Sequence, residues 1–152
     1  MKKFKFRLES VLDTRKKHLD DCQLEMAKVK NKLNYEVQIL KKYNQTKKER
    51  RKSVNKMLKS GENLDFTVTH TFRHYLHKME EAISLQEIKI KTKEKELQEK
   101  QQAVVEALKE KTMLEKLREK EYKAYITNLE KLDLMEIDEI ATRKNSQQSY
   151  FY

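Results

Sequence analysis

Three histidines close together in the chain have the spacing best suited to metal binding. His70, His74 and His77 are separated by four and three residues, which on a helix places their imidazoles on neighbouring turns. The same side chains are also ordinary polar neighbours of Phe72 and Leu76, two apolar positions near the start of a helix. Because this second interpretation requires no ligand, we expect no metal site.

The only cysteine, Cys22, is the other side chain with reactive chemistry. A single cysteine can form no intramolecular disulfide, so it gives no indication of an oxidising compartment. Cys22 also falls on the apolar stripe described below, where a thiol packs as a small apolar side chain. We expect a packing role rather than a redox role.

Enzymatic chemistry has little support in the sequence. Phosphate-binding loops such as GxxxxGKS/T and GxGxxG need more than one glycine, and Gly61 is the only one. The slender pair of helices predicted below also offers no deep pocket in which a carboxylate pair or a Cys/His pair could be tuned. We therefore expect that the chain is not an enzyme and uses no cofactor.

The densest basic cluster is KKYNQTKKERRKSVNK at residues 41–56. Helical geometry spreads its cations around the helix, and only Tyr43 is available to stack on a base, so specific nucleic-acid recognition is not favoured. We expect this surface to face a protein partner and to bind nucleic acid non-specifically at low salt. A basic coiled coil that binds nucleic acid or associates with itself is the alternative hypothesis.

The composition is typical of long helices. The 152 residues include one Gly and no Pro or Trp, and 39% are charged against 37% hydrophobic. The formal net charge of +10 is unevenly placed: residues 1–60 carry 19 Lys or Arg and 7 Asp or Glu, whereas residues 61–152 carry 16 and 18. This asymmetry suits a nucleic-acid-binding face or two segments that attract each other in an antiparallel pair.

The sequence shows neither a secretory signal nor a membrane span. Charged side chains interrupt residues 4–14, where a signal peptide would need a continuous apolar region. No apolar run elsewhere is long enough to cross a bilayer. We expect a cytosolic protein without membrane insertion.

An apolar stripe with alternating steps of four and three residues predicts a first helix over residues 4–59. Ten of its fourteen positions after Leu8 are apolar and four are charged. Charged seam residues either fix the register of a coiled coil at a cost in stability or open the seam to display something. The charged positions are Arg15, Glu36, Lys47 and Arg50.

A second stripe predicts a helix over residues 67–144, after a tip at residues 60–66. Gly61 can supply a left-handed C-cap to the first helix, and Asp65 or Thr67 can cap the second. The tail at residues 145–152 has no period and is expected to fray. The whole chain, residues 1–152, is thus predicted to form a single coiled-coil domain.

Two helices joined by a short connection fold back as an antiparallel hairpin. A reversal near residue 63 places residue 4 opposite roughly residue 122, so the paired part should be about 80–85 Å long and the end of the second helix should overhang. The predicted fold class is all-α, a long two-helix antiparallel coiled-coil hairpin with an overhanging second helix. Unpaired apolar residues of this kind usually mark an interface. Those in the overhang are Ile126, Leu129, Leu132, Met135 and Ile140.

Three stretches resemble the flagellar type III export protein FliJ family. They are FKFRLESVLDTRKKHLDDCQLEMAKV at the start, FRHYLHKMEEAI after the tip and KLREKEYKAYITNLEKLDLMEIDEIATRK near the end. Phe6, Leu8, Val11, Leu12 and Arg15 fall at the places that the family's opening pattern expects. Their order and spacing together extend the resemblance over nearly the whole chain.

The resemblance implies a fold like the rotor coiled coil of the F1 ATP synthase and a role in flagellar protein export. It implies contacts with the hexameric export ATPase FliI, with the cytoplasmic domain of the export gate FlhA and with export chaperones, at the cytoplasmic face of the inner membrane. Lys47 and Gln86 stand where other members can carry an aromatic residue and a histidine. The positions that match the family's gate-binding face are Leu40, Tyr43, Tyr75, Met79 and Ala82.

The end of the hairpin near the termini is the predicted contact with the ATPase ring, because charged side chains and the overhang gather there. The catalysis would belong wholly to the ATPase. A stalk protein of a virulence-type injectisome would share these features and is a further alternative. The expected ATPase-binding residues are Arg7, Arg15, Ile126, Leu129, Leu132, Met135 and Ile140.

Overall fold

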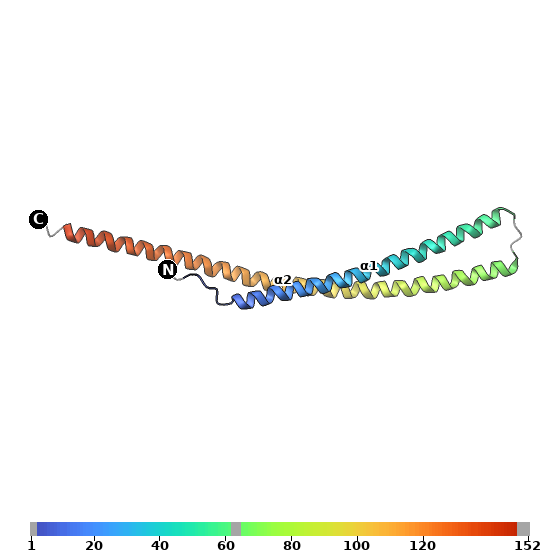
Figure 1. Ribbon diagram of the computed structural model, residues 1–152, viewed down its shortest axis with the longest axis horizontal. Helices are drawn as coiled ribbons and strands as arrows, with labels where there is room; N and C mark the ends of the chain where they lie inside the picture. Colours follow the sequence, from blue (N-terminus) through green and yellow to red (C-terminus); the bar gives the residue numbers. More distant parts are fainter. Residues whose placement is uncertain (1–2, 62–64, 149–152) are drawn as a thin grey trace. The chain divides into compact units, whose positions relative to one another are not determined.

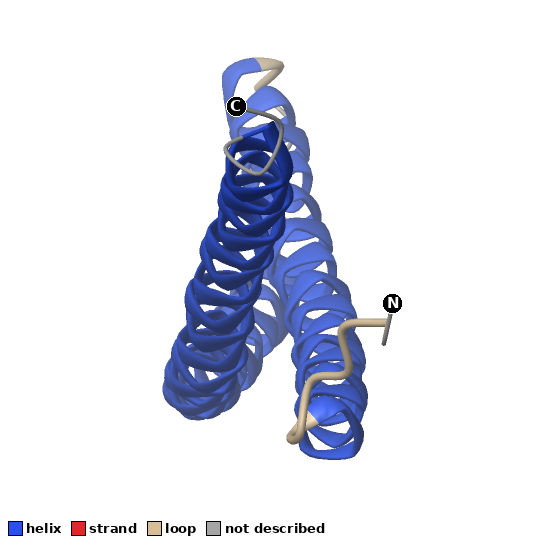
Figure 2. Cartoon of the chain, turned by 90° about the vertical axis from the view of Figure 1, so that its left-hand side faces the viewer, coloured by secondary structure: helices blue, strands red, loops and turns tan. Residues whose placement is uncertain are grey.

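The computed structural model describes residues 3–61 and 65–148, with side chains up to residue 144. Two helices account for nearly all of them: α1, Glu9–Lys59, has 51 residues and α2, Phe66–Gln148, has 83 (Figure 1). The described residues contain no strand, and loop occurs only before α1 and at the tip (Figure 2). The two helices pack against each other as a hairpin, which confirms the predicted all-α fold class.

Helix α1 begins at Glu9, later than the expected start at residue 4. The carbonyl of Leu8 accepts the first helical hydrogen bond, from the N–H of Leu12 at 2.9 Å. The residues before it leave the helical path because Phe4 and Phe6 pack their rings inward: Phe6 is 4% exposed, and Phe4 contacts tyrosines of α2. Burying the Phe6 ring and packing Phe4 against two tyrosines outweighs one more turn of helix, and the heptad pattern alone does not reveal that competition.

In the described part of the tip, Gly61 and Asp65 occupy the helix-capping positions that the sequence predicts. Gly61 has a φ of 73°, the left-handed conformation that glycine adopts without a steric penalty. The backbone carbonyl of Asp65 accepts N–H groups of Val68 at 2.9 Å and Thr69 at 3.2 Å, so Asp65 holds the N-cap position of α2. Residues 62–64 of the expected tip lie outside the described residues.

Helix α2 ends at Gln148, beyond the expected end at residue 144. The expected frayed tail at 145–152 is therefore wrong for residues 145–148, which are helical, while residues 149–152 lie outside the described residues. The absence of apolar periodicity did not end the helix, because this segment contains no Pro or Gly to break it.

Contacts divide the chain into two units, and the first comprises residues 1–20 and 106–152. Its core is formed by Phe6, Leu12, Leu19 and Ala107, of which Leu12 is completely buried. The ring of Phe4 lies 5.2 Å from that of Tyr122, in an edge-on contact at 75°. This contact confirms the expected pairing of residue 4 with roughly residue 122.

The second unit comprises residues 21–105. Among the residues of this unit that the structure describes, Val29 and Ile90 are buried and apolar, and Gln86 is buried and polar. Toward the tip, over residues 41–61 and 65–85, no described residue is fully buried. Figure 1 shows the two helices spread apart over this part of the unit.

Candidate functional site

An apolar groove lies between α1 and α2 in the tip half of the second unit, and we call it the tip groove. It has a volume of about 450 Å³. Val54, Phe72 and Tyr75 are half-buried in its walls, while Met57 and Val68 are 45% and 49% exposed. The groove is lined by Arg50, Ser53, Val54, Met57, Thr67, Val68, Thr71, Phe72 and Tyr75.

The surface beside the tip groove is strongly basic. Residues 41–59 carry nine Lys or Arg and one Glu, for a net charge of +8. A shallow hollow of about 230 Å³ on α1 gathers four of these cations. Apolar walls beside concentrated positive charge suit an acidic, amphipathic partner. The hollow is lined by Asn44, Lys47, Lys48, Arg51, Lys52 and Asn55.

Two charged seam residues in the second unit have partners on the opposite helix. The ammonium of Lys47 lies 2.8 Å from the carboxylate of Glu80. The amide of Gln86 donates to the backbone carbonyl of Glu36 at 3.0 Å and also to the Glu36 carboxylate. A hydrogen bond from Lys47, with its positive charge, lowers the pKa of Glu80. These pairs favour register fixing over an open seam at residues 36 and 47.

The remaining two charged seam residues differ from each other. Arg15 lies 2.7 Å from Glu110 across the first unit, so it too pairs the helices. Arg50, by contrast, lines the tip groove. The structure therefore divides the two interpretations between residues: Arg15 holds the seam, whereas Arg50 borders an opening in it.

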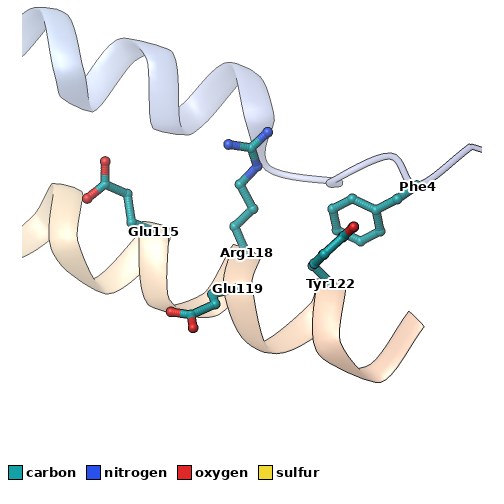
Figure 3. A pocket seen from close by; sticks show the side chains of 5 residues that line it. All are labelled: Phe4, Glu115, Arg118, Glu119 and Tyr122. Carbon is teal, nitrogen blue, oxygen red and sulfur yellow. The ribbon is translucent and has the colours of Figure 1, made fainter. Parts of the chain in front are cut away.

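A second hollow, of about 380 Å³, lies where the residues before α1 meet α2 (Figure 3). The ring of Phe4 stands beside Tyr122, and Arg118 reaches toward α1, where it pairs with Glu9 at 3.2 Å. Glu119 has a lowered pKa because Lys123 donates a hydrogen bond to it, one turn along the same helix. The Phe4–Tyr122 ring contact and the Arg118–Glu9 ion pair close this end of the paired helices.

The overhang is the part of α2 from residue 126 to residue 144, which follows the contact of Phe4 with Tyr125. Ile126 and Leu129 are half-buried, whereas the large apolar side chains farther along are 56–66% exposed. Exposed apolar residues gathered in one segment indicate an interaction surface. These exposed side chains are Leu132, Leu134, Met135, Ile137 and Ile140.

Two of the three candidate metal-binding histidines, His70 and His77, take part in ordinary contacts. The ring of His70 lies beside Phe66, and His77 lies 3.2 Å from the carboxylate of Glu81. No group of three or more His, Cys, Asp or Glu residues in the described part of the chain is placed to hold a metal ion. Cys22 is half-buried on the seam, where an apolar role was expected.

Comparison with known protein families adds one finding. The profile described as "Flagellar FliJ protein" matches residues 4–149. The chain belongs to the flagellar FliJ protein family. Searches of curated proteins and of solved structures gave no match. Membership of this non-enzymatic family gives the FliJ-family chain a role related to flagellar protein export.

The expected gate-binding residues of this FliJ-family chain lie together in the second unit. All five are half-buried, on α1 and α2 in the stretch that leads to the tip. Tyr75 also lines the tip groove, so the expected face borders a cavity that the sequence did not reveal. The five residues are Leu40, Tyr43, Tyr75, Met79 and Ala82.

The expected ATPase-binding residues all lie in the first unit, but they differ in exposure and in whether they are already paired. Arg7 is exposed, while Arg15 is engaged with Glu110. Sequence reasoning missed Leu134 and Ile137, which lie off the seven-residue stripe and are 61% and 60% exposed. A count of apolar residues around the whole helix, independent of the seam, would have found them.

The described helices of the FliJ-family chain include none that is long and apolar enough to span a membrane. This agrees with the absence of a long apolar run in the sequence.

Proposed function

We propose that the chain is a non-catalytic stalk of the flagellar export apparatus that binds the hexameric export ATPase FliI through its overhang and stimulates ATP hydrolysis. Membership of the FliJ family supports the export role. The observation that carries the ATPase contact is the row of large apolar side chains left exposed along the overhang.

The distribution of these side chains suits an enclosed partner site. With 3.6 residues per turn, Leu132, Leu134 and Met135 point in different directions around α2, and Ile137 and Ile140 in others again. Apolar and acidic side chains thus alternate around this helix, so a partner can contact apolar side chains from more than one side. The central opening of a ring allows such contacts, and an asymmetric helix there would make the ring subunits unequal in nucleotide binding.

We further propose that the stretch leading to the tip contacts the cytoplasmic domain of the export gate FlhA and that the same protein escorts export chaperones. The half-buried Tyr43 and Tyr75 offer aromatic contact area, and the basic surface beside the tip groove favours acidic partner surfaces. The gate and the ATPase would then be bound by different units of the chain.

The test is ATP hydrolysis by the purified export ATPase at physiological salt, with and without the full-length chain. We expect stimulation by the native chain and its loss in the variant Leu132→Asp with Met135→Asp. Both positions are exposed, so far-ultraviolet circular dichroism should show unchanged helicity. The matched control is Gln98→Asp with Gln101→Asp, which adds the same charge at exposed positions of α2 outside the overhang.

Stimulation by both variants to the native level would refute the overhang as the ATPase contact. Absence of stimulation by the native chain, together with binding to random DNA that weakens linearly with the logarithm of salt concentration, would favour the basic nucleic-acid-binding coiled coil instead.

A further inference from the structure

We propose that the overhang of one copy docks in the tip groove of a second copy, so that the chain associates head to tail. This goes beyond the proposed function, because it requires neither the ATPase nor the gate. Each copy carries both halves of the contact, an exposed helical segment in its first unit and an open groove in its second unit.

The apolar surfaces of the two partners match in kind. The tip groove offers Val54, Met57, Val68 and Phe72 as walls, and no described residue in this part of the unit is fully buried within its own copy. The Thr71 hydroxyl already donates to the carbonyl of Thr67 at 2.8 Å, so it does not require water as an acceptor. A third helix laid between α1 and α2 would cover these walls, as helices dock in apolar grooves of other proteins.

Charge complementarity favours the overhang as the segment that occupies the tip groove. Residues 129–140 consist of six apolar residues, five Asp or Glu and one Lys, with a net charge of −4. Residues 41–59, which form the α1 side of the groove and its basic surroundings, have a net charge of +8. Two overhangs laid against each other would bring their acidic stretches, residues 129–140, into contact, and this like-charge contact is unfavourable. The tip groove therefore offers the overhang a better partner than a second overhang does.

The contact is heterologous, because different surfaces of the two copies meet. Head-to-tail contacts leave one groove and one overhang unused at the ends of each assembly, so growth can continue with protein concentration. Association would also cover the overhang and the tip groove at once. Copies in this form would be withheld from any other partner of either surface.

The first experiment is sedimentation velocity of the full-length chain alone, over about a hundredfold range of concentration. We expect the mean mass to rise with concentration at low salt. Raising NaCl from about 50 mM to about 500 mM should weaken association about tenfold or more, because the contact pairs opposite charges. A monomer at every concentration would overturn the proposal.

The second experiment separates the two surfaces. The groove variant is Met57→Asp with Val68→Asp, and the overhang variant is Leu134→Lys with Ile137→Lys; all four positions are exposed within one copy. We expect each variant alone to be monomeric. Mixed together they should form a 1:1 dimer and nothing larger, because the mixture retains one native groove and one native overhang.

Two controls accompany the mixture. Gln23→Asp with Asn34→Asp matches the groove variant in charge, and Gln98→Lys with Gln101→Lys matches the overhang variant; these exposed positions lie outside both surfaces. Both control proteins should associate like the native chain. If the groove variant associates normally, or if the mixture stays monomeric, head-to-tail docking is wrong. Normal association of the groove variant is the result expected if two overhangs pair with each other.

Discussion

At the scale of single residues, polar side chains on the seam determine how the two helices align. Apolar seam residues tolerate slippage by a whole heptad, because one leucine resembles another. The pair of Lys47 and Glu80 opposes slippage in one direction, since a shift by seven residues that way would place Lys47 opposite Arg73, a like charge. The Gln86 amide, buried and bonded to Glu36, imposes the same restriction through hydrogen bonds.

Because Glu80 is a carboxylate, its contribution to the alignment of the two helices depends on pH. Its pKa lies below the ordinary value of 4.5 because Lys47 donates a hydrogen bond to the ionised form. A lowered folded-state pKa stabilises the hairpin above pH 4.5, and this contribution is lost as the pH falls through the folded-state pKa. We therefore expect Glu80→Gln to lower the free energy of unfolding at neutral pH and to have no effect in strong acid.

Urea unfolding of both proteins at neutral and acidic pH measures this difference. Glu87→Gln is the matched control, an exposed carboxylate of the same helix. A deficit in the Glu80→Gln variant that persists undiminished in acid would show that the lost interaction is not ionic.

At the scale of elements, the helices were predictable, but their ends and the spaces between them were not. The heptad stripe depends only on sequence order, so it located both helices and the hairpin. The start of α1 depends instead on Phe4 and Phe6 finding aromatic and apolar partners on α2. The tip groove depends on the distance between α1 and α2 near Phe72, and the heptad pattern does not determine that distance.

In the overhang, too, the heptad pattern predicted only part of the structure. The unequal lengths of the two predicted helices implied an overhang. Leu132, Met135 and Ile140 are exposed, as the prediction of unpaired apolar residues requires, whereas Ile126 and Leu129, predicted in the same way, are half-buried. Leu134 and Ile137 escaped notice because stepping along one seam assumes that a helix has a single apolar face. In this segment apolar and charged residues alternate on all sides of the helix.

The tip element allows a direct test of the role of Gly61. Its φ of 73° is costly for a residue with a Cβ, yet nothing lies within 4 Å of the place that a Cβ would take. We expect Gly61→Ala to destabilise the hairpin by about 1 kcal/mol through backbone conformation alone.

Gly61→Asn is the matched control, because asparagine tolerates the left-handed conformation better than alanine. Thermal unfolding of the three proteins should give the order Gly, Asn, Ala from most to least stable. An alanine variant as stable as the native chain would mean that the tip adopts another backbone conformation at no cost.

At the scale of the whole molecule, the two units bury their seams to different extents. The first unit has Phe6, Leu12, Leu19 and Ala107 in its core. The tip half of the second unit has no fully buried residue among those described. Local opening is easiest where few apolar contacts must be broken, and surfaces that bind partners are commonly found in such regions.

Hydrogen exchange should therefore reveal a gradient of protection along the chain. At low protein concentration, backbone amides near Val54 and Phe72 should exchange about tenfold faster or more than those near Leu12 and Leu19, because their local opening breaks fewer buried contacts. Uniform protection, or slower exchange at the tip, would contradict this expectation.

Repeating the exchange at high protein concentration connects the gradient to association. If an overhang enters the tip groove, the amides near Val54 and Phe72 should become more protected, and those of residues 129–140 should follow. The groove variant, which retains its own overhang but cannot receive another, should show no such change. Protection that rises at the tip alone would mean that a surface other than the overhang fills the groove.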